Sequence, residues 1–280
     1  WGGLYTETLP LIAAEAREAE ALGRLARAAR AWANASYYHV AVGQLTEARR
    51  TLERAEALAA RLGTPIPTAI YSQHLLCATL NEGWEPVHAT FSFLATADNP
   101  ALAWALGFAQ AGRCESAAHL GRPEEALDAI RMLVPWLERA PVWTITYPGM
   151  AYAAADALWV LQRVDHIDVV EWALREKVLP ANFRCMHDGH LALARVCALT
   201  GRHEEAERWF AESRRVLDEE GSRPLRALCD FDEALMYARR GDAGDAARAR
   251  PLLAAGRRQF EDIGMTGWVR RADELEKQLS

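Results

Sequence analysis

The chain has 280 residues, of which 51% are hydrophobic and 25% charged, a balance that excludes a disordered chain. Its net charge of −6 and the lack of a basic stripe argue against nucleic-acid binding, because phosphate neutralisation supplies most of that affinity. The sequence has no apolar run of membrane-spanning length and no visible leader. We therefore expect no membrane contact. Its five cysteines are widely spaced, so we expect reduced thiols and a cytoplasmic location.

Taken in chain order, apolar helical patterns alternate with turns. Residues 6–22 resemble the second helix of a hairpin whose first helix is missing, which predicts a piece of a longer protein. Turn signals follow about every forty residues, at Gly43, Gly83, Gly121, a slot without glycine near Arg163, Gly201 and Gly241. The β-like run at 142–147 is interpreted as a joint, like Pro100, Pro141 and Pro180. Residues 266–279 predict a final capping helix.

The segments around the turns are similar to one another. Five residues after the glycine, the strong copies have Ala48, Ala126 or Ala206. Each unit therefore predicts helix A, a tight turn, helix B and a joint, and such hairpins bury their apolar faces only by stacking. The sequence predicts one all-α domain over 1–280, with a partial repeat at 1–25 and repeats at about 26–64, 65–100, 101–141, 142–181, 182–222 and 223–264.

The repeat resembles the tetratricopeptide (TPR) family. A large residue, a small residue, alanine, a large apolar residue and a second alanine stand at the family's offsets in the first copy, as Trp32, Ser36, Ala48, Leu52 and Ala55. The later copies have Gln110, Cys114, Ala126, Ile130 and Leu133, and His190, Ala194, Ala206, Phe210 and Ser213. The resemblance implies a right-handed α-solenoid, although the family's usual repeat is shorter, near 34 residues, and this chain has an aromatic at the first large position only at Trp32.

A second resemblance concerns large bacterial regulators, in which a nucleotide-switch domain precedes a helical superhelix and the effector is a LuxR-type or class III nucleotide-cyclase domain. The ending at 264–268, with Arg270, Arg271 and Ala272, is similar to such C-termini. It implies a sensing arm that binds an inducer, a protein or peptide, or another domain of the parent chain.

In TPR proteins the concave side is lined by helix A, at fixed offsets before the turn glycine. Carried onto this sequence, the resemblance implies a groove of mixed apolar and polar character. Its expected ligand-binding residues are Arg30, Tyr37, Gln73, Phe108, Glu115, Asp188 and Arg195. Simple packing or solvent exposure of these residues is the alternative.

One short segment contains possible metal ligands. Cys185, His187 and His190 are zinc-type ligands, and the two histidines can share a helical face. A structural zinc site has four ligands, and no second cluster stands at a suitable spacing, so a packed histidine is the usual interpretation. We expect no cofactor.

Aromatic and acidic residues also gather along the chain. The central aromatics suit either a ligand pocket or the core, and are Trp136, Trp143, Tyr147, Tyr152, Trp159 and Trp172. The carboxylate pairs Glu124-Glu125 and Glu204-Glu205 stand early in helix B, where the helix dipole favours acids, so they do not indicate catalysis. The sequence has neither a phosphate-binding loop nor a nucleophile elbow.

The forty-residue period and the absence of catalytic motifs predict a non-enzymatic interaction domain, and the resemblances imply that it belongs to a cytoplasmic bacterial signal-transduction or transcription regulator. Two alternatives stay open. Repeated hairpins, tryptophans and scattered acids also fit an α/α-toroid enzyme that acts on carbohydrate, whose chain ends would close together. A scaffold that assembles identical chains through a terminal repeat is the other.

Overall fold

The computed structural model describes residues 5–63, 67–96, 103–139, 146–181 and 187–279. All the regular secondary structure in these ranges is helical, as expected for an all-α chain. No helix in the described ranges has both the length and the apolar character needed to cross a membrane. The chain divides into two compact units, one of residues 83–214 and the other of residues 3–82 together with 215–280.

Unit 1 (residues 83–214) contains a run of consecutive helices, the last of which continues into unit 2. Its helices are α5 (Trp84–Thr96), α6 (Ala103–His119), α7 (Pro123–Arg139), α8 (Thr146–Leu161), α9 (Ile167–Ala173), a π-helical turn (Leu174–Val178), α10 (Leu179–Ala181), α11 (Gly189–Leu199) and α12 (His203–Glu220). Helix α8 packs against α6 and α11, while α7 packs on α6 and α9. First helices of neighbouring hairpins thus lie next to each other.

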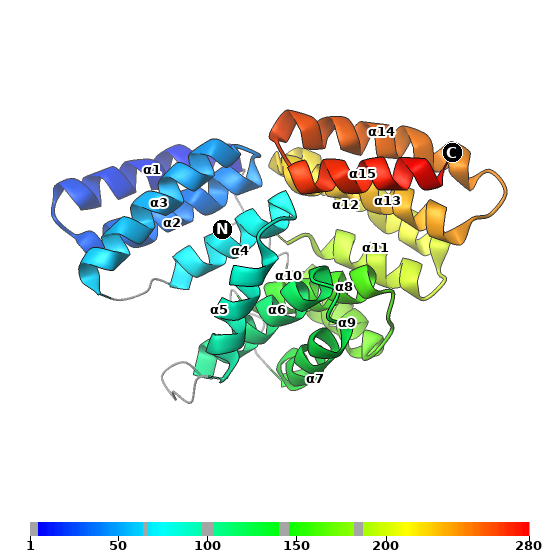
Figure 1. The fold of residues 1–280 in the computed structure, drawn as a ribbon, viewed down its shortest axis with the longest axis horizontal. Coiled ribbons are helices and arrows are strands. Elements are labelled where there is room, and N and C mark those ends of the chain that lie inside the picture. Colours follow the sequence, from blue (N-terminus) through cyan, green and yellow to red (C-terminus); the bar gives the residue numbers. More distant parts are fainter. Residues whose placement is uncertain (1–4, 64–66, 97–102, 140–145, 182–186, 280) are drawn as a thin grey trace. The chain divides into compact units, whose positions relative to one another are not determined.

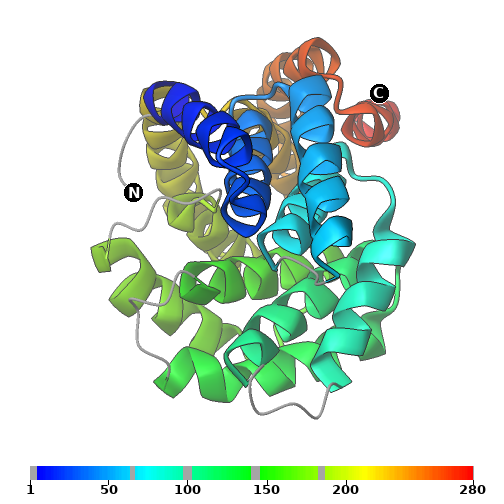
Figure 2. The same cartoon turned by 90° about the vertical axis from the view of Figure 1, so that its left-hand side faces the viewer.

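Unit 2 (residues 3–82 and 215–280) combines helices from both ends of the sequence. They are α1 (Tyr5–Ala21), α2 (Leu25–Ala41), α3 (Leu45–Leu62), α4 (Pro67–Leu80), α13 (Arg223–Arg240), α14 (Asp245–Ile263) and α15 (Thr266–Gln278). Helix α2 packs on α1 and α3 (Figure 2), and α13, α14 and α15 pack side by side (Figure 1). The helices predicted at 6–22 and 266–279 are observed as α1 and α15.

Most of the turns between paired helices have one geometry. At Gly121, which has φ 69°, the glycine N–H donates to Ala118 O at 3.1 Å and the next N–H donates to Ala117 O at 2.9 Å. Gly43 and Gly201 make the same two bonds with their own preceding helices. This Schellman arrangement needs a left-handed residue after the helix, which glycine adopts without a steric cost.

Two turns use other residues. Asn81, with φ 52°, makes the turn that was expected at Gly83, because its N–H and that of Glu82 donate to Ala78 O and Cys77 O. In the slot near Arg163, Gln162 has φ 54° and Arg163 N–H donates to Leu158 O. A short polar side chain such as asparagine tolerates the left-handed region, whereas glutamine is strained there.

Some expected joints differ from the structure. Pro180 lies inside α10 rather than between elements, in the last residues of the continuous helical segment that α9, the π-helical turn and α10 form. The β-like run ends in α8, which begins at Thr146, while 142–145 lie outside the described residues. Pro100 and Pro141 lie outside them as well.

The last helix of unit 2 packs against its first half. The Trp268 indole N–H donates to Ala78 O at 3.0 Å, and both Thr266 and Arg270 donate to the Glu82 carboxylate at 2.8 Å. Gly267 approaches so closely that a Cβ there would stand 2.4 Å from Leu80 O. Helix α15 therefore does more than cap the preceding hairpin: an open solenoid would leave the first and last hairpins apart, and in unit 2 they touch.

Candidate functional site

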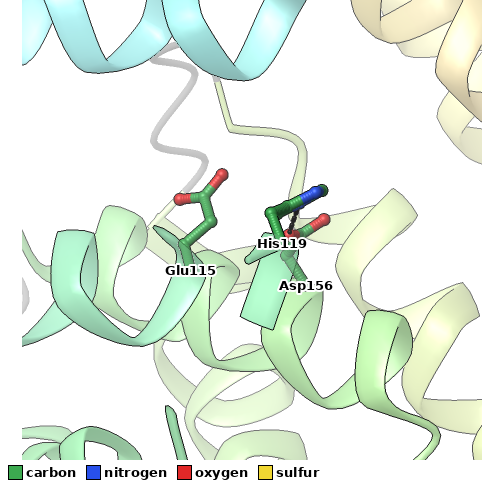
Figure 3. Close-up of side chains that lie close together, drawn as sticks. All are labelled: Glu115, His119 and Asp156. Atoms are coloured by element: carbon green, nitrogen blue, oxygen red, sulfur yellow. Dashed lines mark hydrogen bonds and ion pairs between the residues drawn. The ribbon is translucent and has the colours of Figure 1, made fainter. Parts of the chain in front are cut away.

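A cluster of charged side chains lies in unit 1 on α6, α8 and α11. Asp156 accepts from His119 Nε2 at 3.0 Å through one carboxylate oxygen and from Arg195 at 2.8 Å through the other. Glu115 lies one helical turn before His119 on α6, and Figure 3 shows its carboxylate on the same side of the helices as the other two side chains. One ligand atom from each of Glu115, His119 and Asp156 lies within 4.8 Å of the others.

The turns between helices place these side chains together. Glu115 stands six residues before Gly121, Asp156 six before Gln162 and Arg195 six before Gly201. Because the three turn residues all have positive φ, the same offset points to the same face of each preceding helix. Helices α6, α8 and α11 pack in that order, so the three residues become neighbours. We call Glu115, His119, Asp156 and Arg195 the charged cluster.

Aromatic rings surround the charged cluster. The Trp84 ring stacks on His119 with centroids 4.3 Å apart and planes 11° apart. The Arg195 guanidinium lies over the Tyr152 ring at 5.3 Å, and Tyr152 meets the His187 ring edge-on at 4.8 Å. These contacts fix the planes of the imidazole and the guanidinium, since stacked rings have few alternative rotamers.

The charged cluster is buried. Only 3% of the His119 side chain, 7% of Asp156 and 1% of Arg195 are exposed, and Glu115 is 5% exposed. Burial raises the pKa of the neighbouring Cys114 thiol well above its usual value, and the charges of Glu115 and Asp156 raise it further. Cys114 is therefore a packed thiol rather than a nucleophile.

The structure brings two of the predicted groove residues together, Glu115 and Arg195. A third, Asp188, caps α11 instead: its carboxylate accepts from the backbone N–H groups of His190 and Leu191 and from the Ser213 hydroxyl. Phe108 is half-buried with its ring edge-on to Phe91, at 5.2 Å between centroids.

The other predicted groove residues lie in unit 2. Arg30 and Gln73 are exposed. Tyr37 is buried, with its ring edge-on to Tyr38 at 5.2 Å and stacked on Tyr71 at 5.7 Å. Tyr37 is thus a packing residue on this face of α2, while Arg30 faces solvent.

The possible metal ligands of the sequence have other contacts. His187 packs on Tyr152, and His190 Nδ1 lies 2.8 Å from the Asp188 carboxylate. Cys185 lies outside the described residues. His119 and Asp156 were not predicted, although the six-residue offset before Gln162 would have indicated Asp156.

The central aromatics are largely core. Tyr147, Tyr152 and Trp159 are buried, while Trp172 is 42% exposed and Trp143 lies outside the described residues. The Tyr147 hydroxyl donates to Leu137 O, and burial raises its pKa to about 12. Tyr152 of this group contacts the charged cluster, through Arg195.

A Ser–His–Glu arrangement elsewhere in unit 1 resembles catalytic machinery. His88 bonds the Ser116 hydroxyl at 3.0 Å and the Glu125 carboxylate at 3.0 Å. Ser116 is fully buried and its hydroxyl donates to Gly112 O at 2.6 Å. Because the Ser116 hydroxyl donates its hydrogen to Gly112 O, His88 is not placed to remove that hydrogen as a general base. We interpret these bonds as contacts that hold α5, α6 and α7 together.

No protein-family model matches the chain, and no curated protein matches it.

Proposed function

We propose that the chain is a TPR-like binding domain of a bacterial regulator, and that it recognises a ligand through the face of α6, α8 and α11 that carries the charged cluster. The ligand is a peptide segment or a small molecule with charged groups of its own. Recognition, not catalysis, is the proposed activity.

Recurring local geometry supports the TPR-like part of the proposal. Left-handed residues end helices at Gly43, Asn81, Gly121, Gln162 and Gly201, so their spacing stays near forty residues even where glycine is absent. Within each unit, consecutive helices pack as neighbours, as in stacked hairpins.

The observation that carries the proposal is the buried Asp156–Arg195 pair with Glu115 and His119 beside it. Burying charges removes their hydration, and well-packed apolar residues at such positions are often as stabilising as an ion pair. Stability alone therefore does not account for four ionisable groups on one helix face. A site for a charged ligand does, because fixed charges in a poorly hydrated site give strong and specific contacts.

The α/α-toroid enzyme has one observation in its favour, because α15 contacts α4. A glycosidase needs one protonated and one ionised carboxyl group, commonly about 5 to 9.5 Å apart, on either side of the sugar bond. In the charged cluster Asp156 is bonded to both His119 and Arg195, and ligand atoms of Glu115 and Asp156 lie within 4.8 Å. That arrangement suits binding better than acid–base catalysis.

Calorimetric titration tests the proposal. Charged and uncharged short peptides and free amino acids are titrated, in the presence of a chelator, into the wild type and an Asp156→Leu/Arg195→Met double variant. We expect a charged ligand that binds the wild type and is lost in the double variant, because the double variant removes the fixed charges. Arg258→Met, an exposed position in unit 2 outside the predicted groove, is the matched control and should bind normally. Equal binding by all three proteins, or no binding by any ligand, would count against the proposal.

A further inference from the structure

Three side chains of the charged cluster combine donor atoms that metal ions use. His119 offers an imidazole nitrogen, and Glu115 and Asp156 each offer a carboxylate oxygen, all within 4.8 Å of one another. Glu115 and His119 are four residues apart on α6, so their side chains lie on one face of that helix, and Asp156 approaches from α8. We propose that these three residues bind a divalent transition-metal ion.

The distances fit such an ion. Metal–ligand bonds of 2.0–2.2 Å place two ligand atoms about 3.0 to 3.5 Å apart. His119 Nε2 and Asp156 Oδ2 are already 3.0 Å apart, so an ion can take the place of the hydrogen between them after a small rotation of the two side chains. Since the three ligand atoms lie within 4.8 Å, Glu115 needs to come closer by up to about 1.5 Å, which a change of its side-chain torsions supplies.

The surroundings hold the ligands in place. The Arg195 guanidinium bonds Oδ1 of Asp156, which leaves Oδ2 directed at His119. Trp84 stacks on the imidazole and fixes its plane. Carboxylates and imidazoles that bind metals are usually held in place by hydrogen bonds from residues around them. Arg195 has this relation to Asp156, so it acts here as a positioning residue.

The donor set indicates the kind of metal. An imidazole favours zinc, iron, cobalt or nickel, whereas magnesium prefers carboxylates and water alone. Three protein ligands leave at least one coordination position for water or for an oxygen of a ligand. In this last respect the inference rests on the proposed function, since the ion would then help to hold a charged ligand.

The test is a titration of chelator-treated full-length chain with Zn²⁺, and separately with Co²⁺ followed by visible absorption. We expect one ion per wild-type chain and no comparable binding of Mg²⁺. His119→Gln and Glu115→Gln should each weaken Zn²⁺ binding by at least about tenfold. His190→Gln is the matched control, because it removes a histidine of the segment 185–190 and should bind as the wild type does.

The outcomes separate the possibilities. Loss in His119→Gln and Glu115→Gln, with both variants folded by circular dichroism, supports the site. Unchanged binding in either of them, loss in His190→Gln, or no stoichiometric ion in the wild type would overturn it. Glu115→Gln changes little volume, so it remains informative if His119→Gln does not fold. Because peptide binding is measured with chelator present, failure of the metal site leaves the proposed function standing, and the reverse also holds.

Discussion

The two units of the chain are stabilised by different kinds of contact. In unit 2 the decisive contacts join segments far apart in sequence, through the Trp268 bond to Ala78 O and the close approach of Gly267. In unit 1 the corresponding faces of successive hairpins carry charge, and the Asp156–Arg195 pair joins α8 to α11. Unit 2 also buries charge, but its pairs are local in sequence: Asp230 pairs with Arg226 on the same helix, and Asp245 pairs with Arg240 across the short turn between α13 and α14.

This difference distinguishes contacts that stabilise the fold from the charged face for which we propose ligand binding. Close backbone approach and aromatic packing, as in unit 2, stabilise without a desolvation cost. A buried ion pair between helices carries that cost and adds little net stability, so its presence in unit 1 marks the face where we propose binding.

The largest effect is expected when the buried pair of unit 1 loses one partner. Arg195→Met leaves the buried Asp156 carboxylate without its guanidinium partner, which should lower the free energy of unfolding by about 3–5 kcal/mol in urea titrations. The double variant Asp156→Leu/Arg195→Met should recover much of that loss, since both charges of the pair are then removed together. A loss below about 1 kcal/mol in Arg195→Met would show that this pair is hydrated and not a buried one.

The next effect concerns the contact between the two halves of unit 2. Gly267→Ala places a Cβ within 2.4 Å of Leu80 O and 2.6 Å of Asn81 O, both backbone atoms that cannot turn aside. We expect a loss of about 1–3 kcal/mol in the free energy of unfolding, as for overpacked sites. Glu274→Ala, at an exposed position of the same helix, should change it by no more than about 0.5 kcal/mol. Equal effects of the two variants would contradict the close approach.

A smaller and opposite effect is expected at the turn after α8. Gln162 adopts φ 54°, where glycine stands in the corresponding turns at Gly121 and Gly201. Gln162→Gly should therefore stabilise unit 1 by up to about 1 kcal/mol, because the left-handed region costs a side-chain-bearing residue about that much. Gly201→Ala should destabilise, and a thermal-unfolding series of both variants checks the sign. Destabilisation by Gln162→Gly would mean that the glutamine side chain makes a contact worth more than the strain.

The smallest effect is a pH dependence of the contact between α4 and α15. Hydrogen bonds from Thr266 and Arg270 hold the pKa of Glu82 below its usual value of 4.5. Its contribution is therefore complete above that value and is lost as the pH falls through the lower pKa of the folded chain. Since 39% of the Glu82 side chain is exposed, we expect Glu82→Gln to cost only a few tenths of a kcal/mol at neutral pH. The difference between variant and wild type should vanish in acid; a difference that grows there would contradict this assignment.

The helices could be predicted from the sequence because particular residue types stand at their ends. Gly43, Gly121 and Gly201 are the residues that a left-handed turn favours, so the spacing of the hairpins could be read from them. The same reasoning identified Glu115 and Arg195 through their offset from two of these turns. It missed Asp156 because Gln162 makes the intervening turn without the residue type that marks it.

The partner of Trp268 and the roles of Asp188 and Tyr37 could not be predicted from the sequence. The acceptor of the Trp268 indole is a backbone carbonyl, which every residue has, so nothing in the sequence indicates its partner. Asp188 has the charge expected of a groove residue, but its position directly before α11 makes it a helix cap. Tyr37 has the right offset for a groove, yet the neighbouring tyrosines enclose it.

Unit 2 combines segments from both ends of the sequence, and this has a consequence for folding. The Trp268–Ala78 bond closes a loop of 190 residues, within which all of unit 1 is inserted. On the ribosome, α1 to α4 emerge long before the helix that packs on them, so unit 1 can complete its core while unit 2 still exposes part of its own. Contacts of such high sequence separation form late and slowly, which makes the arrival of α15 the step that completes the native state.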